Sequence, residues 1–162
     1  MNIFTDGACK RNGSQSAYGG IGVYFGNSDP HNVCEAVPPM SLGRPVTNQM
    51  TELLALLRAL EQIIESNMSP VHIYSDSSYS VKSYNTWMHS WSQNGWVTAS
   101  KTPVKNKDIM QELWNASCLI QEKGLSVDVL WCRGHQTADS VIAKGNGEAD
   151  KLAVAAANVA NV

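Results

Sequence analysis

The chain has 162 residues, a net charge of −2, and a composition that is 43% hydrophobic and 16% charged. A chain of this length can bury a core, so we expect one domain that spans residues 1–162, and the composition excludes a disordered protein. The charge balance lacks the strongly basic total of a nonspecific nucleic-acid binder. Any nucleic-acid surface must therefore come from local clustering of charge.

The sequence carries no signal for export or membrane insertion. No basic and apolar leader precedes the first strand-like segment, and no apolar run approaches membrane-spanning length. Four cysteines are widely spaced and show no paired pattern: Cys9, Cys34, Cys118 and Cys132. Unpaired thiols in a reducing compartment are the simplest explanation. We therefore expect a cytoplasmic monomer with no membrane contact and no evident protein partner.

The N-terminal half predicts three strands and a long helix. A short apolar strand opens the chain and ends at Asp6-Gly7. Tyr18–Phe25 is its expected hairpin partner, and Asn32–Val37 is a third strand. The strongest helix signal spans Thr47–Ile64, where apolar residues recur at 53, 56, 57, 60, 63 and 64. An antiparallel meander followed by a helix is the expected arrangement.

The C-terminal half predicts alternating helices and strands. In chain order these are a strand at Val71–Tyr74, a helical segment at Ser77–Asn85, a helix and protruding loop over Asn85–Trp96, a helix at Asp108–Lys123, a strand at Ser126–Trp131, a polar loop at Gln136–Val141, and a final helix that opens at Gly145 and runs to about Ala160. Strands that follow one another through helical connections run parallel. The whole chain therefore predicts an α/β fold with a mixed sheet and helices on its faces.

Four acidic residues fall where this fold would bring them together. Asp6 and Asp76 end two strands that should run parallel, so both side chains emerge at one sheet edge. Glu52 lies in the first turns of the connecting helix, and Asp150 lies in the first part of the last helix. Close carboxylates repel one another, and a hard divalent cation such as Mg²⁺ or Mn²⁺ neutralises them. A carboxylate site with two such ions is typical of phosphoryl transfer, and without paired Cys or His ligands we do not expect zinc.

Each of these residues also has a simpler explanation when it is taken alone. Asp6 could be an ordinary turn aspartate, and Glu52 a solvated acid near the helix N-terminus. His135 alone resembles an ordinary loop histidine. Three tryptophans at helical spacing usually belong to a core, and we expect Trp91 and Trp96 to be buried. Only the four acids in combination favour a catalytic site.

A series of short motifs resembles the successive signatures of the type 1 ribonuclease H family. They are Thr5-Asp6-Gly7-Ala8-Cys9, Thr47-Asn48-Gln49-x-x-Glu52-Leu53, Ser75-Asp76-Ser77-x-Tyr79, Trp131-x-x-Gly134-His135 and Gly145-Asn146-x-x-Ala149-Asp150-x-Leu152-Ala153. The stretch from Thr86 through Gly95-Trp96 to Asp108 is similar to the family's substrate-handling protrusion and the helix after it. The resemblance covers nearly the whole chain. It implies the five-stranded mixed sheet of the ribonuclease H-like fold, with three antiparallel strands followed by parallel ones.

The resemblance also implies a reaction and its catalytic residues. The reaction is endonucleolytic hydrolysis of the RNA strand of RNA–DNA hybrids, leaving 5′-phosphate and 3′-hydroxyl ends. Two Mg²⁺ ions, for which Mn²⁺ can substitute, would be the cofactors. Asp6 would bridge both ions, with Glu52 and Asp76 on one ion and Asp150 on the other. His135, on a mobile loop before the last helix, would assist proton transfer or product release.

Substrate contacts are implied by the same motifs. Asn12, Asn48 and Gln49 would contact the minor groove of the hybrid, where 2′-hydroxyls distinguish RNA from DNA. Thr47 would contact a DNA phosphate, and an exposed Trp87 would pack on the sugars of the DNA strand. The sequence departs from the family in two places. The protrusion is not densely basic, since its lysines come only at 101, 105 and 107, and this predicts that affinity for nucleic acid depends only weakly on salt. The second departure is the loop over residues 136–144, which is longer than expected.

Two other functions are compatible with the same fold. An integrase-like nuclease would also group acids on this sheet, although the Thr47-Asn48-Gln49 and Trp87 motifs favour the ribonuclease branch. A catalytically silent nucleic-acid-binding module is the second alternative, because fold does not determine function. Such a module usually loses one of the acids, and this sequence retains all four.

Overall fold

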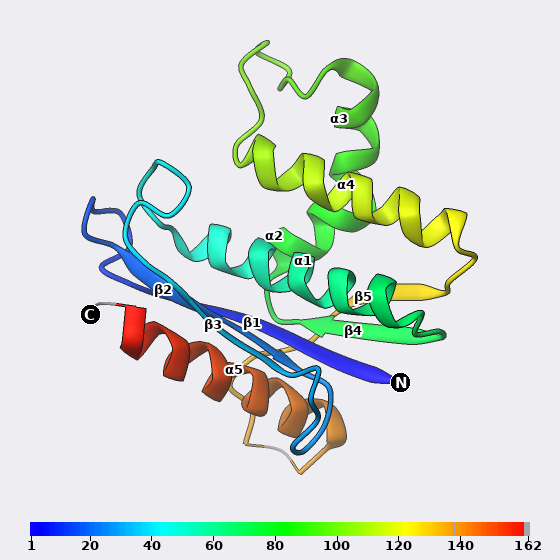
Figure 1. Cartoon of the computed structure of the whole chain (residues 1–162). Coiled ribbons are helices and arrows are strands. Elements are labelled where there is room, and N and C mark those ends of the chain that lie inside the picture. Colours follow the sequence, from blue (N-terminus) through cyan, green and yellow to red (C-terminus); the bar gives the residue numbers. More distant parts are fainter. Residues whose placement is uncertain (138, 161–162) are drawn as a thin grey trace.

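A five-stranded mixed sheet forms the centre of the protein, in the order β3-β2-β1-β4-β5 (Figure 1). The computed structural model describes residues 1–137 and 139–160. Its strands are β1 (Asn2–Lys10), β2 (Tyr18–Tyr24), β3 (Val33–Val37), β4 (Val71–Ser75) and β5 (Val127–Trp131). β1, β2 and β3 pair antiparallel, whereas β4 pairs parallel with both β1 and β5. The predicted fold class, a five-stranded mixed sheet with three antiparallel strands followed by parallel ones, is therefore confirmed.

Helices cover both faces of this sheet. They are α1 (Asn48–Ser66), α2 (Ser78–Lys82), the π-helix η1 (Ser83–Trp87), α3 (Met88–Asn94), α4 (Lys107–Glu122) and α5 (Val141–Ala160). Figure 1 shows α1 on one face with α4 and α3 stacked beyond it, and α5 alone on the opposite face. None of the described helices is both long and apolar enough to cross a membrane.

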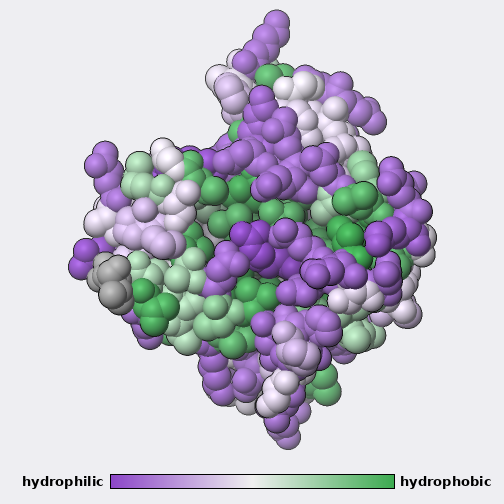
Figure 2. Space-filling view, viewed as in Figure 1, coloured by the Kyte–Doolittle hydropathy of each residue, from purple (hydrophilic) through white to green (hydrophobic). Residues whose placement is uncertain are grey.

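The α1 face holds a core of large aliphatic side chains. The helical period brings Leu53, Leu56 and Leu60 to the sheet, where they are fully buried with Ile3 and Ile73. Burial of each such side chain stabilises the fold by roughly 1.5–3 kcal/mol. Figure 2 shows a polar surface over the outer side of α1 and hydrophobic side chains in the hollow between α1 and α4. That hollow has a volume of about 450 Å³ and is lined in part by Leu57, Ile64 and Leu119.

The α5 face is built from small residues, so helix and sheet approach closely. A Cβ atom added at Gly20 of β2 would lie 2.2 Å from the carbonyl oxygen of Ala153, and one at Gly22 would lie 2.2 Å from that of Ala149. Both glycines are therefore required by the helix backbone itself. The sheet-facing positions of α5 are mostly alanines: Ala149, Ala153, Ala156 and Ala157.

The start of α5 corrects the prediction that Gly145 opens the last helix. The helix begins at Val141, and the hydroxyl of Ser140 accepts a hydrogen bond from the Ala143 amide at 3.1 Å. Gly145 lies inside the helix, and glycine is needed there because a Cβ atom would lie 2.2 Å from the ring of Phe4. Close packing thus explains a glycine that resembled a helix entry. The loop before the helix ends at Ser140, and its residue Ala138 lies outside the described residues.

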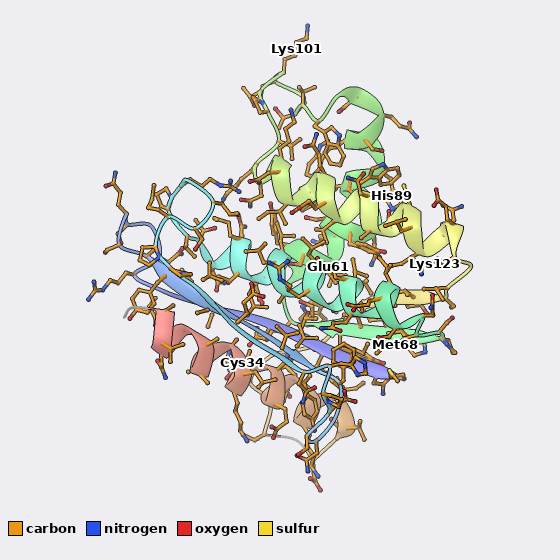
Figure 3. The ribbon with its side chains drawn as sticks, viewed as in Figure 1. Cys34, Glu61, Met68, His89, Lys101 and Lys123 are labelled. Carbon is orange, nitrogen blue, oxygen red and sulfur yellow. The ribbon has the colours of Figure 1, made fainter. Side chains whose placement is uncertain are left out.

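The protrusion consists of η1, α3 and the loop that leads to α4. The π-helix was not predicted. Its Asn85 donates a hydrogen bond to the Val129 carbonyl of the edge strand β5 at 2.9 Å. Trp91 and Trp96 were expected to be buried; they pack against the core but are only partly buried, whereas Trp87 keeps 36% of its surface exposed. Figure 3 shows Lys101 at the tip of the protruding loop, far from the sheet.

Candidate active site

Asp6 and Asp76 stand where two parallel strands separate. The pairing of β1 with β4 ends at Thr5 and Ser75, and the two aspartates are the next residues of each chain segment. β1 itself continues to Lys10, because its pairing with β2 continues through Asp6 and Gly22. Asp6 therefore does not end its strand, as the sequence suggested, but it lies at the expected edge between the two strands. This geometry brings the two carboxylates together.

Glu52 reaches the same place from α1. It lies in the second turn of the helix and is buried. The Gly7 amide donates a hydrogen bond to its Oε1 atom at 2.5 Å. A Cβ atom at Gly7 would lie 2.5 Å from the Glu52 amide nitrogen, so only glycine permits this close approach of strand and helix. Asp6-Gly7 thus supplies both a carboxylate and the donor that orients a second one.

The three carboxylates form a compact and electrostatically strained cluster. One oxygen from each of Asp6, Glu52 and Asp76 lies within 4.8 Å of the other two. Burial, followed by the charges of Glu52 and Asp76, raises the pKa of Asp6 above its ordinary value of 3.8. Burial and then the charge of Asp76 also raise the pKa of Glu52 above 4.5. Oxygen donors this close, which repel one another when ionised, fit a hard divalent cation.

Asp76 is held by two hydrogen bonds and lies against a third neighbour, none of which sequence reasoning assigned to it. The Asn146 amide donates to its Oδ2 atom at 3.3 Å, and the Trp131 indole donates to its backbone carbonyl at 3.2 Å. A Cβ atom at Gly134 would lie 2.5 Å from the same Oδ2 atom. Asn146 is buried, although the sequence shows only a polar residue four positions before Asp150. A polar residue one helical turn before a candidate acid was the available signal.

Asp150 and His135 complete the pocket. Both line a polar cavity of about 520 Å³ together with the three clustered acids. The proximity of Asp150 contributes to the raised pKa of Asp6, after burial and the charges of Glu52 and Asp76. Because α5 starts at Val141, Asp150 lies in the middle of the helix and not in its first part. His135 is exposed and has a backbone φ of 53°, which turns the chain between β5 and α5.

The expected substrate residues divide into two groups. Asn48 and Gln49 line the acidic cavity, and the Oε1 atom of Gln49 is buried without a hydrogen-bond partner among the described residues. Asn12 lies beside them, because its Oδ1 atom accepts a hydrogen bond from the Asn48 backbone amide at 3.2 Å. Thr47 caps α1, since its hydroxyl accepts a hydrogen bond from the Met50 amide.

Trp87 stands apart from this cavity. Its ring contacts that of Tyr79, which does line the cavity, with centroids 6.0 Å apart. A larger cavity of about 690 Å³ lies between β1, β2 and the start of α5, where Phe4 and Tyr24 line it. It contains none of the predicted site residues. The polar cavity with the four acids is therefore the candidate active site.

Comparisons with known proteins agree with this geometry. The RNase H family model matches residues 1–158. Ribonuclease H of Schizosaccharomyces pombe is 38% identical over 151 residues, which cover 93% of this chain and 50% of that protein. Ribonuclease H of Nitrosospira multiformis is 37% identical over 153 residues, which cover 94% of this chain and 86% of that protein.

The fold also matches solved structures. One is the foamy viral protease-reverse transcriptase in complex with an RNA/DNA hybrid, at a TM-score of 0.75 and 24% identity, over 98% of this chain and 20% of that one. The chain spans about half the length of the eukaryotic curated relatives it matches, and most of the length of the bacterial one. The family match over nearly the whole chain shows that this protein belongs to the ribonuclease H family.

Proposed function

We propose that this chain is an endonuclease that hydrolyses the RNA strand of RNA–DNA hybrids and leaves 5′-phosphate and 3′-hydroxyl ends. The observation that carries the proposal is the convergence of four carboxylates from β1, α1, α5 and the end of β4 in one polar cavity. We propose that residues 1–162 act as one catalytic domain. We also propose a monomer in a reducing, cytoplasmic compartment, which the four free thiols of the chain support.

Divalent metal ions fit this donor set. Asp6, Glu52 and Asp76 would hold one ion, and Asp6 with Asp150 would hold a second, with Mg²⁺ as the preferred ion and Mn²⁺ as a substitute. When bound, such ions supply a lowered pKa for water and stabilisation of the leaving oxygen. The raised pKa values of Asp6 and Glu52 support this assignment, because a nearby cation offsets both the burial and the like charges that raise them.

The chain's own groups orient the acids and handle protons. The Gly7 amide fixes Glu52, and Asn146 fixes Asp76, so both carboxylates are positioned before substrate arrives. His135 lies on the wall of the same cavity, on an exposed turn, from which its imidazole can take or give a proton at the reacting phosphate.

Substrate recognition would combine a minor-groove contact with an aromatic platform. Gln49 lines the acidic cavity, and a side-chain amide there can exchange a hydrogen bond with a 2′-hydroxyl. Asn12 and Asn48 would extend this contact, and Thr47 would contact a phosphate of the DNA strand. Trp87 would pack on the DNA sugars, and Lys101 at the tip of the protrusion would add an electrostatic contact to the backbone.

The test is cleavage of a strand-labelled hybrid with Mg²⁺, with EDTA, and with the Asp76→Asn variant. Single-stranded RNA, duplex RNA and duplex DNA serve as controls. We expect cutting of the RNA strand of the hybrid alone, and its loss with EDTA and with the substitution. Binding of the hybrid without cleavage would support a silent module, and cutting of duplex DNA would support an integrase-like nuclease.

A further inference from the structure

The cavity between β1, β2 and the start of α5 takes no part in the proposed reaction. It has a volume of about 690 Å³, against about 520 Å³ for the acidic cavity, and none of the four candidate acids lines it. Clefts of roughly 300–1,000 Å³ that combine apolar walls with a few polar groups are where proteins bind small ligands. The walls of this cavity therefore indicate what it would bind.

One wall of this cavity is aromatic. Phe4 of β1, Tyr24 at the end of β2 and the next residue, Phe25, all line it. Phe4 and Tyr24 are paired across the two strands, with ring centroids 6.4 Å apart. Phe4 is also stacked on Tyr74 of β4, at a centroid distance of 5.4 Å and an interplanar angle of 20°. Flat rings that are fixed in this way favour a flat aromatic ligand.

The opposite wall carries charged side chains of α5. Lys144, Glu148 and Lys151 line the cavity, and their spacing places them on one stripe of the helix. Lys144 pairs with Asp139 at 2.8 Å and Lys151 with Glu148 at 3.2 Å, but the two lysine side chains are 66% and 75% exposed. Such exposed pairs are weak, so either ammonium group is available to another anion. The cavity wall itself holds two ammonium groups and one carboxylate, which favours an anionic ligand.

Amide groups and open space complete the cavity. Asn2 and Gln136 line it, and both are exposed. A side-chain amide both donates and accepts hydrogen bonds, so it matches the edge of a nucleobase. Gly147 also lines the cavity, between the two lysines in sequence, and a Cβ atom there would meet nothing within 4 Å. A larger side chain at Gly147 would therefore enter open space and not displace protein atoms.

We propose that this cavity binds a nucleotide through its flat base and its 5′-phosphate. The base would lie against Tyr24 and Phe25, and the phosphate would meet Lys144 and Lys151. The Glu148 carboxylate would accept a hydrogen bond from a ribose hydroxyl. The site uses none of the four acids and goes beyond the proposed function. Its ligand has one of two sources: a free nucleoside 5′-monophosphate, or the terminal nucleotide of a strand that carries a 5′-phosphate.

The test titrates the whole chain with adenosine 5′-monophosphate, with adenosine and with inorganic phosphate. EDTA is present throughout, so that no metal ion holds a phosphate at the acidic cavity. We expect the monophosphate to shift the NMR amide signals of Gly145 and Gly147, with a dissociation constant of about 0.1–1 mM. Adenosine should bind about fivefold more weakly, and inorganic phosphate alone should not shift these signals. Unchanged signals, or equal affinity for adenosine, would overturn the proposal.

Substitutions locate the site. Gly147→Leu fills the cavity and should weaken binding of the monophosphate at least about tenfold. Ala155→Leu is its control, at an exposed position of the same helix outside the cavity. Lys144→Gln and Lys151→Gln should each weaken the monophosphate about threefold and leave adenosine unchanged, whereas Lys82→Gln, at an exposed position on α2, should change neither. If Gly147→Leu does not fold, the lysine variants carry the test. Wild-type affinity in a folded Gly147→Leu protein, or in both lysine variants, would overturn the proposal.

A last pair of ligands distinguishes the two sources. A short single-stranded RNA with a 5′-phosphate is compared in EDTA with the same RNA carrying a 5′-hydroxyl. If the phosphorylated RNA shifts the Gly147 signal, a terminal nucleotide enters the cavity; if only the monophosphate does so, the ligand is the free nucleotide. An equal shift with both RNAs would overturn the phosphate contact. None of these measurements uses cleavage, so a failure of the proposed function would leave this site standing.

Discussion

Helices α1 and α5 cover opposite faces of one sheet, and each delivers an acid to the same cavity. α1 packs through leucines and isoleucines that fill volume, and it carries Glu52. α5 packs through alanines against the bare backbone of Gly20 and Gly22, and it carries Asp150. The α1 face should therefore be sensitive to lost volume, and the α5 face to added volume. Asp6 lies on the sheet between the two helices and lines the same cavity as both acids.

The largest effect is expected where the two faces meet. Asp6→Asn should reduce hybrid cleavage at least about 1,000-fold, which corresponds to about 4 kcal/mol, because it removes the carboxylate shared by both proposed ions. Single-turnover cleavage by the folded variant measures this. Asp128→Asn, which changes an exposed carboxylate on β5, should keep full activity. Activity of Asp6→Asn within tenfold of the wild type would contradict the site.

Opposite changes of volume should destabilise the two faces to a similar extent. Gly20→Ala adds one methyl group that would lie 2.2 Å from the Ala153 carbonyl oxygen, and it should cost about 3 kcal/mol of unfolding free energy. Leu56→Ala removes buried volume from the α1 face and should cost about 2–5 kcal/mol. Urea unfolding measures both.

Gly147→Ala is the control on α5. A Cβ atom at Gly147 would meet nothing within 4 Å, so the substitution should stabilise the helix by up to about 1 kcal/mol. If Gly20→Ala were tolerated as well as Gly147→Ala, the close approach of α5 to the sheet would be wrong.

The pH dependence of stability should separate the acidic cavity from both packed faces. The folded-state pKa values of Asp6 and Glu52 are raised, so the folded protein holds protons that the unfolded chain releases. Their contribution to stability is fully present below the ordinary pKa values of 3.8 and 4.5, and it is lost as pH rises through the folded values. In EDTA, the unfolding free energy should fall by roughly 1–3 kcal/mol between pH 5.5 and 8.5.

Two controls assign this slope to the cluster. Added Mg²⁺ should flatten it, because a bound cation favours the ionised carboxylates. Asp6→Asn should flatten it in EDTA, because one member of the repelling set is gone. A slope that is identical in wild type and Asp6→Asn would place its origin elsewhere in the protein.

The smallest effects are expected at the first turns of the two helices. Thr47 caps α1 by accepting from the Met50 amide at 3.2 Å, and Ser140 caps α5 by accepting from the Ala143 amide at 3.1 Å. Either substitution to alanine should cost about 1 kcal/mol of unfolding free energy. Only Thr47→Ala should also raise KM, since Thr47 is the proposed phosphate contact. An equal rise in KM for Ser140→Ala would show that the cap and not the contact matters.

The sequence was most informative where local pattern and tertiary structure agree. The period of Leu53, Leu56 and Leu60 predicted α1 and its buried face, and the order of strands and helices predicted a mixed sheet. The convergence of the acids followed from the same topology, because parallel strands present their ends at one edge. The helical period and the order of strands and helices were enough to predict that Asp6, Glu52 and Asp76 lie together, as they do.

The sequence failed where distant packing decides local structure. Gly145 resembled the start of a helix because glycine is a poor helix former, but its place is decided by the ring of Phe4, far away in the chain. β1 continued past Asp6 because β2 pairs with it there. The hydrogen bond from Arg44 to Asn106 was not predicted, because the two residues lie 62 positions apart and only the folded chain brings them together.

The hydrogen bond from Asn85 to Val129 protects the edge strand β5 from pairing with another molecule. β5 forms one margin of the sheet, with β4 as its one neighbouring strand. An exposed edge strand offers backbone acceptors to the amides of another molecule, so two sheets can pair edge to edge. The Asn85 side chain already occupies the Val129 carbonyl at the middle of that margin. The Asn85 side chain thus hinders the pairing of a further strand with β5, and it favours a protein that does not aggregate at high concentration.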